Sequence, residues 1–163
     1  MRSLSIGGET IVIQRVPVSR IIDLRHAVLR AGLPRETAKF PGDEAETSRH
    51  YAAISEGDGR VVGCVTLHAS AYEGEPAWQL RGMAVEEELR SKGVGEALVS
   101  EMEREVVEDR AAPRVMWCNA RTPAVRFYER LGWEKVSEEF VIPTAGPHLR
   151  MVKRLEGNGA GVR

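Results

Sequence analysis

The pattern of hydrophobic and polar residues predicts a strand followed by a helix at the start of the chain. Residues 10–16 are few and rich in β-branched side chains, which is typical of a strand. From residue 17 to residue 32 the apolar positions follow a helical period, with a proline at the start and a glycine at the end. Arg25 lies on or beside the apolar face of this helix. Either its stem packs while its head reaches water, or its guanidinium points into a ligand cleft.

A polar segment and a hairpin come next. Residues 33–49 are rich in turn residues and are expected to form a loop or a short broken helix, placed as the flexible wall of a substrate site. Residues 50–56 and 60–70 read as strands joined by a Gly-Asp-Gly turn, which is a strong hairpin signal. A second loop, residues 71–76, leads into another strand over residues 77–85.

The second half of the chain predicts a crossover between parallel strands. An amphipathic helix is expected after Gly93, and residues 114–119 form a near-continuous apolar strand, as at the centre of a sheet. A strand, a helix and a strand in this order make a right-handed crossover. A short helix over residues 122–132 and two final strands, residues 134–142 and 148–155, complete the series.

Together these elements predict one α/β (α+β) domain over residues 10–155. We expect a mixed central sheet of about six to seven strands with helices on both faces. Residues 1–9 are interpreted as an N-terminal extension, and the glycine-rich residues 156–163 as a disordered tail.

Composition narrows the class of protein. The chain has 163 residues and a formal net charge of −1, which argues against a protein that binds nucleic acid by neutralising phosphates. No apolar run has the length of a membrane span, and the N-terminus lacks the apolar segment of a secretory signal. Cys64 and Cys118 lie in apolar strands and are expected to be reduced thiols. We therefore expect a cytoplasmic protein that binds neither membrane nor nucleic acid.

The most informative segment joins the strand of residues 77–85 to the helix after Gly93. A helix start carries unpaired backbone N–H groups and the positive end of the helix dipole, so it suits phosphate. Gly93 and Gly95 leave that backbone open, and Arg90 and Lys92 add positive charge. The segment predicts a site for a cofactor that contains a diphosphate.

Two motifs carry a resemblance to a known family. The run from Arg90 to Gly95 resembles the Arg/Gln-x-x-Gly-x-Gly/Ala signature of GNAT-type N-acetyltransferases. The run from Asn119 to Trp133 resembles their second signature, in which a strand ends in Asn and a short helix carries Ala-x-x-Phe-Tyr. Trp133 stands where the family usually has Phe. The order of elements over residues 10–155 also matches the family.

The resemblance implies an enzyme that uses acetyl-CoA as acyl donor. It implies that Tyr128 protonates the departing thiolate and that Asn119 helps to hold the pantetheine arm, which enters beside a bulge near Gly82. The cofactor-binding residues that it implies are Met83, Ala84, Val85, Arg90, Ser91, Lys92, Gly93, Val94, Gly95, Glu96, Asn119 and Phe127.

The general base and the acceptor are left open. Many family members carry a glutamate on the strand before the phosphate loop, and this chain has no carboxylate between Pro76 and Val85. The candidates for the base are Glu44, Glu46, Glu75, His148 and a chain of water molecules. Arg25, Arg81 and His148 suggest an acceptor with an anionic group. The acceptor itself is expected to be a primary amine of a small molecule or a protein.

Other functions remain as alternatives. A non-catalytic acyl-CoA sensor or partner module would explain the missing glutamate, although Tyr128 and Asn119 argue against it. A nucleotide-binding phosphate loop would end in Gly-Lys-Ser/Thr, which this loop lacks. Cys118 is expected to be a buried thiol, so direct transfer is preferred to an acyl-enzyme. We expect no metal site, and a homodimer would be typical of the family.

Overall fold

The chain forms two compact units in this computed structural model, which describes residues 2–156. The first unit contains residues 2–68 and 82–105, and the second contains residues 69–81 and 106–156. Strand β5 (Trp78–Val85) contributes its first half to the second unit and its second half to the first. The predicted tail beyond residue 156 lies outside the described residues.

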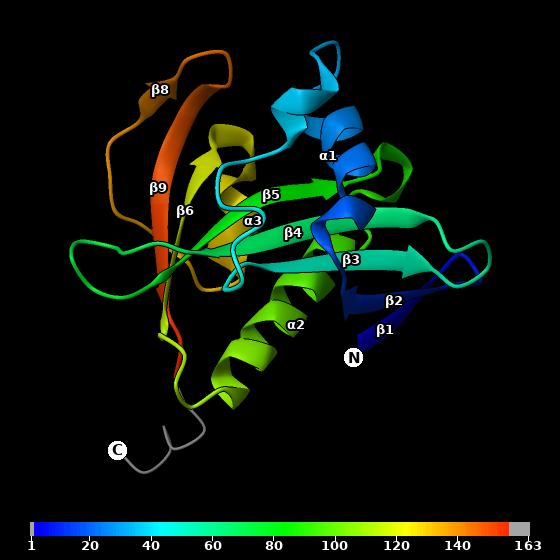
Figure 1. Ribbon diagram of the computed structural model, residues 1–163, viewed down its shortest axis with the longest axis horizontal. Coiled ribbons are helices and arrows are strands. Elements are labelled where there is room, and N and C mark those ends of the chain that lie inside the picture. Colours follow the sequence, from blue (N-terminus) through cyan, green and yellow to red (C-terminus); the bar gives the residue numbers. More distant parts are fainter. Residues whose placement is uncertain (1, 157–163) are drawn as a thin grey trace. The chain divides into compact units, whose positions relative to one another are not determined.

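The first unit is built on antiparallel strands (Figure 1). Neighbouring strands are hydrogen-bonded in the order β1 (Arg2–Ile6), β2 (Glu9–Arg15), β3 (Arg49–Ser55) and β4 (Val61–Ala69). Strand β1 lies within the segment that was predicted as an extension. A turn at Gly7 and Gly8, with φ of +57° and +84°, folds it back on β2, because glycine adopts positive φ without steric cost.

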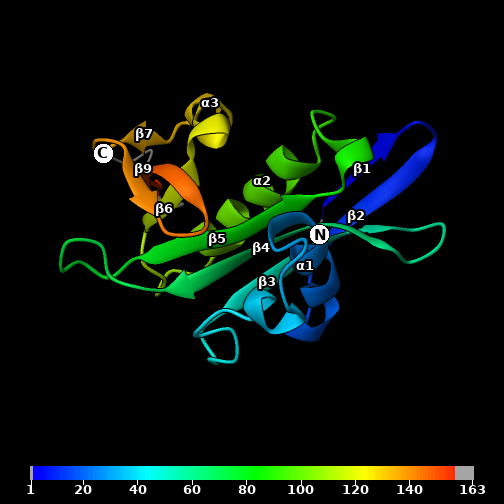
Figure 2. The same ribbon diagram turned by 90° about the horizontal axis from the view of Figure 1, so that it is seen from above.

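Two helices of the first unit cover opposite faces of its sheet, as Figure 2 shows for α1 (Ile22–Leu29) and α2 (Val94–Glu108). On one face, Leu24 packs with Ala52 and Cys64 in a buried apolar cluster. On the other, a Cβ on Gly63 would lie only 2.8 Å from Val94, so this glycine lets α2 approach β4 closely. The helix predicted over residues 17–32 is shorter than expected, since a 3₁₀ turn at Val18–Arg20 (η1) precedes α1.

The second unit contains the parallel pair of strands. Trp78 and Gln79 of β5 pair in parallel with Met116 and Trp117 of β6 (Val115–Arg121). The remaining pairs are antiparallel: β6 with β9 (Gly146–Arg154), and β9 with β7 (Glu134–Lys135) and β8 (Phe140–Ile142). The short helix α3 (Val125–Arg130) follows β6 after a 3₁₀ turn at Thr122–Ala124.

The strand predicted over residues 134–142 is interrupted in the structure. Between β7 and β8, the Ser137 hydroxyl accepts the backbone N–H of Arg150 at 2.8 Å. A side chain thus takes the place of a main-chain carbonyl, and the regular ladder stops there.

The α+β fold and the mixed sheet with a parallel β5–β6 pair are confirmed. The hydrogen-bonded order of strands is β1-β2-β3-β4-β5-β6-β9-β7, with β8 also paired to β9. This sheet has nine strands, which is more than predicted, because β1 was missed and one expected strand is split. Within residues 2–156, no helix is both long and apolar enough to cross a membrane.

Candidate active site

The loop that was predicted to bind phosphate lies in the first unit, between β5 and α2. A 3₁₀ turn at Glu87–Leu89 (η3) is followed by a tight turn in which Ser91 and Gly93 have φ of 65° and 99°. The carbonyl oxygen of Gly93 accepts the N–H of Ala97 at 3.0 Å, so the helix begins there. A Cβ on Gly93 would lie 3.8 Å from Leu4 of β1, and the positive φ therefore explains the glycine better than crowding does.

Six successive backbone amides of this loop are unpaired. In the described part of the chain, no group accepts a hydrogen bond from the N–H of any residue from Ser91 to Glu96. The first N–H groups of a helix have no partner within the helix, and they carry the positive end of its dipole. The loop can therefore donate several hydrogen bonds to an anion.

The side chains around these amides add positive charge. Arg90 and Lys92 are exposed, and the Nε of Arg90 donates to the carbonyl of Val85 at 3.1 Å. This hydrogen bond ties the turn to the end of β5. Gly95 lies inside the first turn of α2, half-buried, and Glu96 is exposed there. Met83 and Val85 are half-buried, whereas Ala84 is 3% exposed.

Gly82 adopts a φ of 68°, and because it has no side chain, other groups can approach its backbone closely. A Cβ there would lie 3.0 Å from Nε of Arg25 and 3.3 Å from the ring of Phe40. Within the first unit, these two side chains are therefore the groups that approach the backbone of β5 at this position.

Arg25 is fully buried, so its head does not reach water. Its Nη1 donates to Asp43 Oδ2 at 2.7 Å and to the carbonyl of Ala38 at 2.8 Å. Its Nη2 donates to Thr66 Oγ1 at 2.9 Å, and its guanidinium lies 4.0 Å from the centre of the Phe40 ring. The role of Arg25 as an acceptor ligand stays a prediction, but in this structure its guanidinium is engaged within the protein.

His50 closes a ring of hydrogen bonds around that guanidinium, which we call the Arg25 ring (Arg25, Asp43, His50 and Thr66). Its Nε2 lies 2.9 Å from the carbonyl oxygen of Asp43, which can only accept, so Nε2 carries the proton. Its Nδ1 then accepts from the Thr66 hydroxyl at 2.8 Å. Burial lowers the pKa of His50 below 6.5, which keeps its imidazole neutral. The loop around Asp43 is thus fixed to the sheet rather than free.

In the second unit, the adjacent residues Cys118 and Asn119 of β6 point to opposite faces of the sheet. Asn119 is half-buried, and its Oδ1 accepts Nε of Arg150 at 3.1 Å. Cys118 points to the opposite face, because side chains alternate along a strand, and its thiol lies near the Tyr128 phenol. Burial raises the pKa of Cys118 to about 12. This thiol therefore stays protonated and is a poor nucleophile.

Tyr128 is 4% exposed and lies among aromatic rings. The rings of Phe127 and Trp133 are 5.0 and 5.4 Å from it, centre to centre. Burial, with a smaller contribution from Cys118, raises the pKa of Tyr128 well above 10. The phenol therefore remains a hydrogen-bond donor at neutral pH. Within residues 2–156, the Tyr128 hydroxyl has no hydrogen-bond partner.

The other candidates have varied surroundings. His148 is 4% exposed, and its Nδ1 donates to the carbonyl of Gly146 at 2.7 Å. Arg81 is half-buried on β5. Glu75 forms an ion pair with Arg154 at 3.1 Å, while Glu44 and Glu46 are exposed. The described residues contain no group of three or more His, Cys, Asp or Glu side chains that could hold a metal ion.

Sequence reasoning missed the partners of these residues. Asp43 was read as a turn residue, and nothing in its local pattern indicated a buried carboxylate. Arg150 could have been found from strand pairing, because it lies directly opposite Asn119 in the β6–β9 ladder. Side chains of directly opposite residues share one face of a sheet.

A comparison with protein families decides the family. The model of the "Acetyltransferase (GNAT) family" matches residues 21–133, which is more than half of the chain. This chain belongs to the GNAT family. It is an N-acetyltransferase that uses acetyl-CoA. It is 30% identical over 149 residues to YitI of Bacillus subtilis (strain 168), named an uncharacterized N-acetyltransferase, with 88% of this chain and 95% of YitI covered.

Solved structures of GNAT proteins agree with the fold. Escherichia coli ElaA matches with a TM-score of 0.73 and 18% identity, over 88% of this chain and 99% of that one. An aminoglycoside 6′-N-acetyltransferase solved with coenzyme A matches with a TM-score of 0.67 and 19% identity, over 88% and 96%. At these identities, the likeness concerns the fold and leaves the acceptor open.

Proposed function

We propose that this GNAT enzyme transfers the acetyl group of acetyl-CoA directly to a primary amine. The observation that carries the proposal is the run of unpaired amides from Ser91 to Glu96, next to the cationic Arg90 and Lys92. A diphosphate needs several donors and positive charge, and this loop offers both.

The transfer forms a bond between the amine nitrogen and the acetyl carbon and breaks the bond between that carbon and sulfur. The amine must be neutral to attack, and it then loses one proton to water or to a basic side chain, which balances the proton that the thiolate gains. The leaving thiolate gains a proton, and Tyr128 is our candidate for its donor. We propose the backbone of Met83, Ala84 and Val85 for the pantetheine arm, as the family resemblance implies.

Burial keeps Tyr128 protonated but also makes it a weaker acid than an exposed phenol, so its role depends on the basicity of the leaving thiolate. A thiolate placed in apolar surroundings becomes more basic, as the raised pKa of Cys118 illustrates. A phenol that stays protonated can donate to such a thiolate. The burial of Cys118 also supports direct transfer, because an acyl-enzyme would require a reactive thiolate there.

The affinity for acetyl-CoA tests whether the loop amides bind the diphosphate. Gly93→Glu places a carboxylate and a strained backbone at the unpaired amides, so we expect acetyl-CoA to bind at least about tenfold more weakly by calorimetry. Gly59→Glu is the matched control, since Gly59 also has a positive φ of 74° and open space around it. Equal affinity in both variants would mean that the diphosphate binds elsewhere.

Thiol release tests the chemistry. With a panel of amines and acetyl-CoA, Tyr128→Phe should lower kcat by about 10²-fold or more, the range of general acid catalysis. The control is Tyr51→Phe, another buried tyrosine. A wild-type protein that binds acetyl-CoA but releases no thiol with any amine would favour the sensor alternative.

A further inference from the structure

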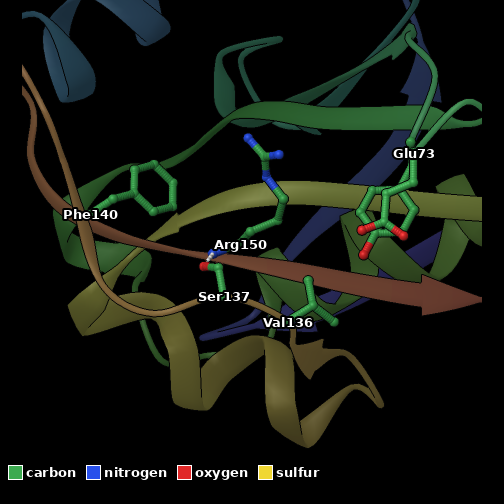
Figure 3. A pocket seen from close by; sticks show the side chains of 6 residues that line it. Glu73, Val136, Ser137, Phe140 and Arg150 are labelled. Atoms are coloured by element: carbon green, nitrogen blue, oxygen red, sulfur yellow. Dashed lines mark hydrogen bonds between the residues drawn. The ribbon is translucent and has the colours of Figure 1, made fainter.

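The second unit contains a pocket to which the proposed function assigns no ligand (Figure 3). Its volume is about 290 Å³. This lies at the lower end of the range of about 300–1,000 Å³ that is typical of small-molecule sites. Its lining comes from the hairpin before β5, from the segment between β7 and β8, and from strands β8 and β9. The lining residues are Tyr72, Glu73, Val136, Ser137, Phe140 and Arg150.

Arg150 is held in a defined orientation in this pocket. Its Nε donates to Asn119 Oδ1 at 3.1 Å, and its backbone N–H donates to Ser137 at 2.8 Å. Its guanidinium carbon lies 4.7 Å from the centre of the Trp117 ring and 6.0 Å from that of Phe140. One edge of the guanidinium is therefore fixed, and aromatic rings accompany its face.

The other edge of this guanidinium is available to a ligand. Within residues 2–156, neither Nη1 nor Nη2 has a hydrogen-bond acceptor, and no carboxylate forms an ion pair with Arg150. This differs from Arg154, four residues later on the same strand, which pairs with Glu75 at 3.1 Å. Two parallel N–H groups on a planar guanidinium match the two oxygens of a carboxylate.

The pocket also presents a negative charge. Glu73 lies in the turn before β5 with a φ of 49°, and Figure 3 shows Arg150 between Phe140 and Glu73. Glu73 is exposed and forms no ion pair with any described residue, but together with the larger contribution of Glu75 it raises the pKa of Arg154. The pocket therefore offers an arginine with two available Nη donors and a carboxylate that Arg154 partly neutralises, which suits a ligand that carries a carboxylate and a cationic group.

We propose that this pocket binds the acceptor and that the acceptor is a small amino acid-like molecule, which carries a carboxylate as well as its amine. Nη1 and Nη2 of Arg150 take the carboxylate in a bidentate pair, and Glu73 favours a cationic group over a second anion. The volume suits a single amino acid better than a protein segment. This inference rests on the proposed transfer to an amine.

Matched pairs of acceptors test the proposal. Each pair is an amino acid and its carboxamide, for example alanine and alaninamide; because the amine of the amide is less basic, the KM values are compared for the neutral amine. We expect the wild type to have a KM at least tenfold lower for the acid. Arg150→Met, which keeps the length of the stem, should raise the KM for the acid at least tenfold and change the KM values for the amide and acetyl-CoA less than twofold.

Arg110→Met is the matched control, because it removes an exposed arginine of the same unit that does not line the pocket and should leave this preference unchanged. If Arg150→Met raised the KM values for the acid, the amide and acetyl-CoA equally, Arg150 would act only through Asn119 and the proposal would be wrong. Equal KM values for acid and amide in the wild type would overturn it as well.

Equilibrium binding separates this proposal from the proposed function. Calorimetry with the same acids and amides needs no turnover. If no amine supports thiol release, but the wild type still binds the acids and Arg150→Met does not, the pocket assignment stands and the transfer assignment fails. If the wild type binds acid and amide equally, or binds neither, the pocket assignment fails whatever the turnover.

Discussion

Arg25 in the first unit and Arg150 in the second are chemically the same side chain in opposite situations. Each lies over an aromatic ring, at 4.0 Å from Phe40 and 4.7 Å from Trp117. Arg25 has no exposed surface, and both of its Nη atoms donate to protein acceptors. Arg150 is half-buried, and within residues 2–156 only its Nε donates from the side chain.

The comparison separates a structural arginine from a candidate ligand-binding one. A buried guanidinium without a counter-charge is costly, so the fold surrounds Arg25 with Asp43, Thr66 and a carbonyl. Arg150 has one fixed edge and one available edge, which is the arrangement needed to present charge to a small molecule. The number of protein acceptors around a guanidinium therefore indicates the role of an arginine better than its position near a predicted site does.

The largest effect is expected from removing the counter-charge of Arg25. Asp43→Asn keeps the shape of the side chain but leaves the buried guanidinium unneutralised, so the free energy of unfolding should fall by about 3–5 kcal/mol. Urea unfolding followed by circular dichroism measures it. Asp23→Asn is the control, because the Asp23–Arg35 pair is exposed and should contribute about 0–1 kcal/mol. Equal losses would mean that the Arg25 ring adds nothing beyond a surface pair.

An intermediate effect on the free energy of unfolding is expected when the pH is lowered. The pKa of His50 is lowered by burial, so below about pH 6.5 the unfolded state takes up a proton that the folded state does not. Stability should fall as the pH drops from about 6.5 to the folded pKa, by at most about 1.4 kcal/mol per pH unit from this residue. His50→Gln should remove that part of the slope. An unchanged slope in His50→Gln would contradict a neutral histidine in the Arg25 ring.

A smaller effect on stability than that of Asp43→Asn is expected at Arg150. Arg150→Met loses one side-chain hydrogen bond, to Asn119, so the free energy of unfolding should change by no more than about 1.5 kcal/mol. The same urea unfolding measures this change beside Asp43→Asn. A loss of several kcal/mol would place Arg150 with Arg25 as a structural residue and would remove the contrast between them.

The local elements were largely predictable because their signals are local. The Gly-Asp-Gly hairpin, the glycine turn into α2 and the proline and glycine that bracket the helix after β6 each depend on a few neighbouring residues. The missed strand β1 also had a local signal, since Leu4 and Ile6 alternate with polar residues before Gly7 and Gly8. It was overlooked because the segment is short and its residues are mostly exposed.

The surroundings of the candidate residues were not predictable in the same way. The contact between Arg25 and Asp43 joins residues eighteen apart in sequence, and that between Arg150 and Asn119 joins residues thirty-one apart. The contact between Arg25 and Asp43 depends on tertiary packing that no pattern of neighbouring residues encodes. The contact between Arg150 and Asn119 follows only once the register of β6 and β9 is known. Sequence named Arg25, Arg81 and His148 as hints of an anionic acceptor, whereas we propose Arg150 for that role.

The proximity of Leu4 in strand β1 to Gly93 has a practical consequence. Strand β1 stands at the end of the hydrogen-bonded strand order, and Leu4 lies 3.8 Å from the point where a Cβ on Gly93 would stand. A substitution at Leu4 would therefore change the surroundings of the turn that opens α2, although the two residues are far apart in sequence.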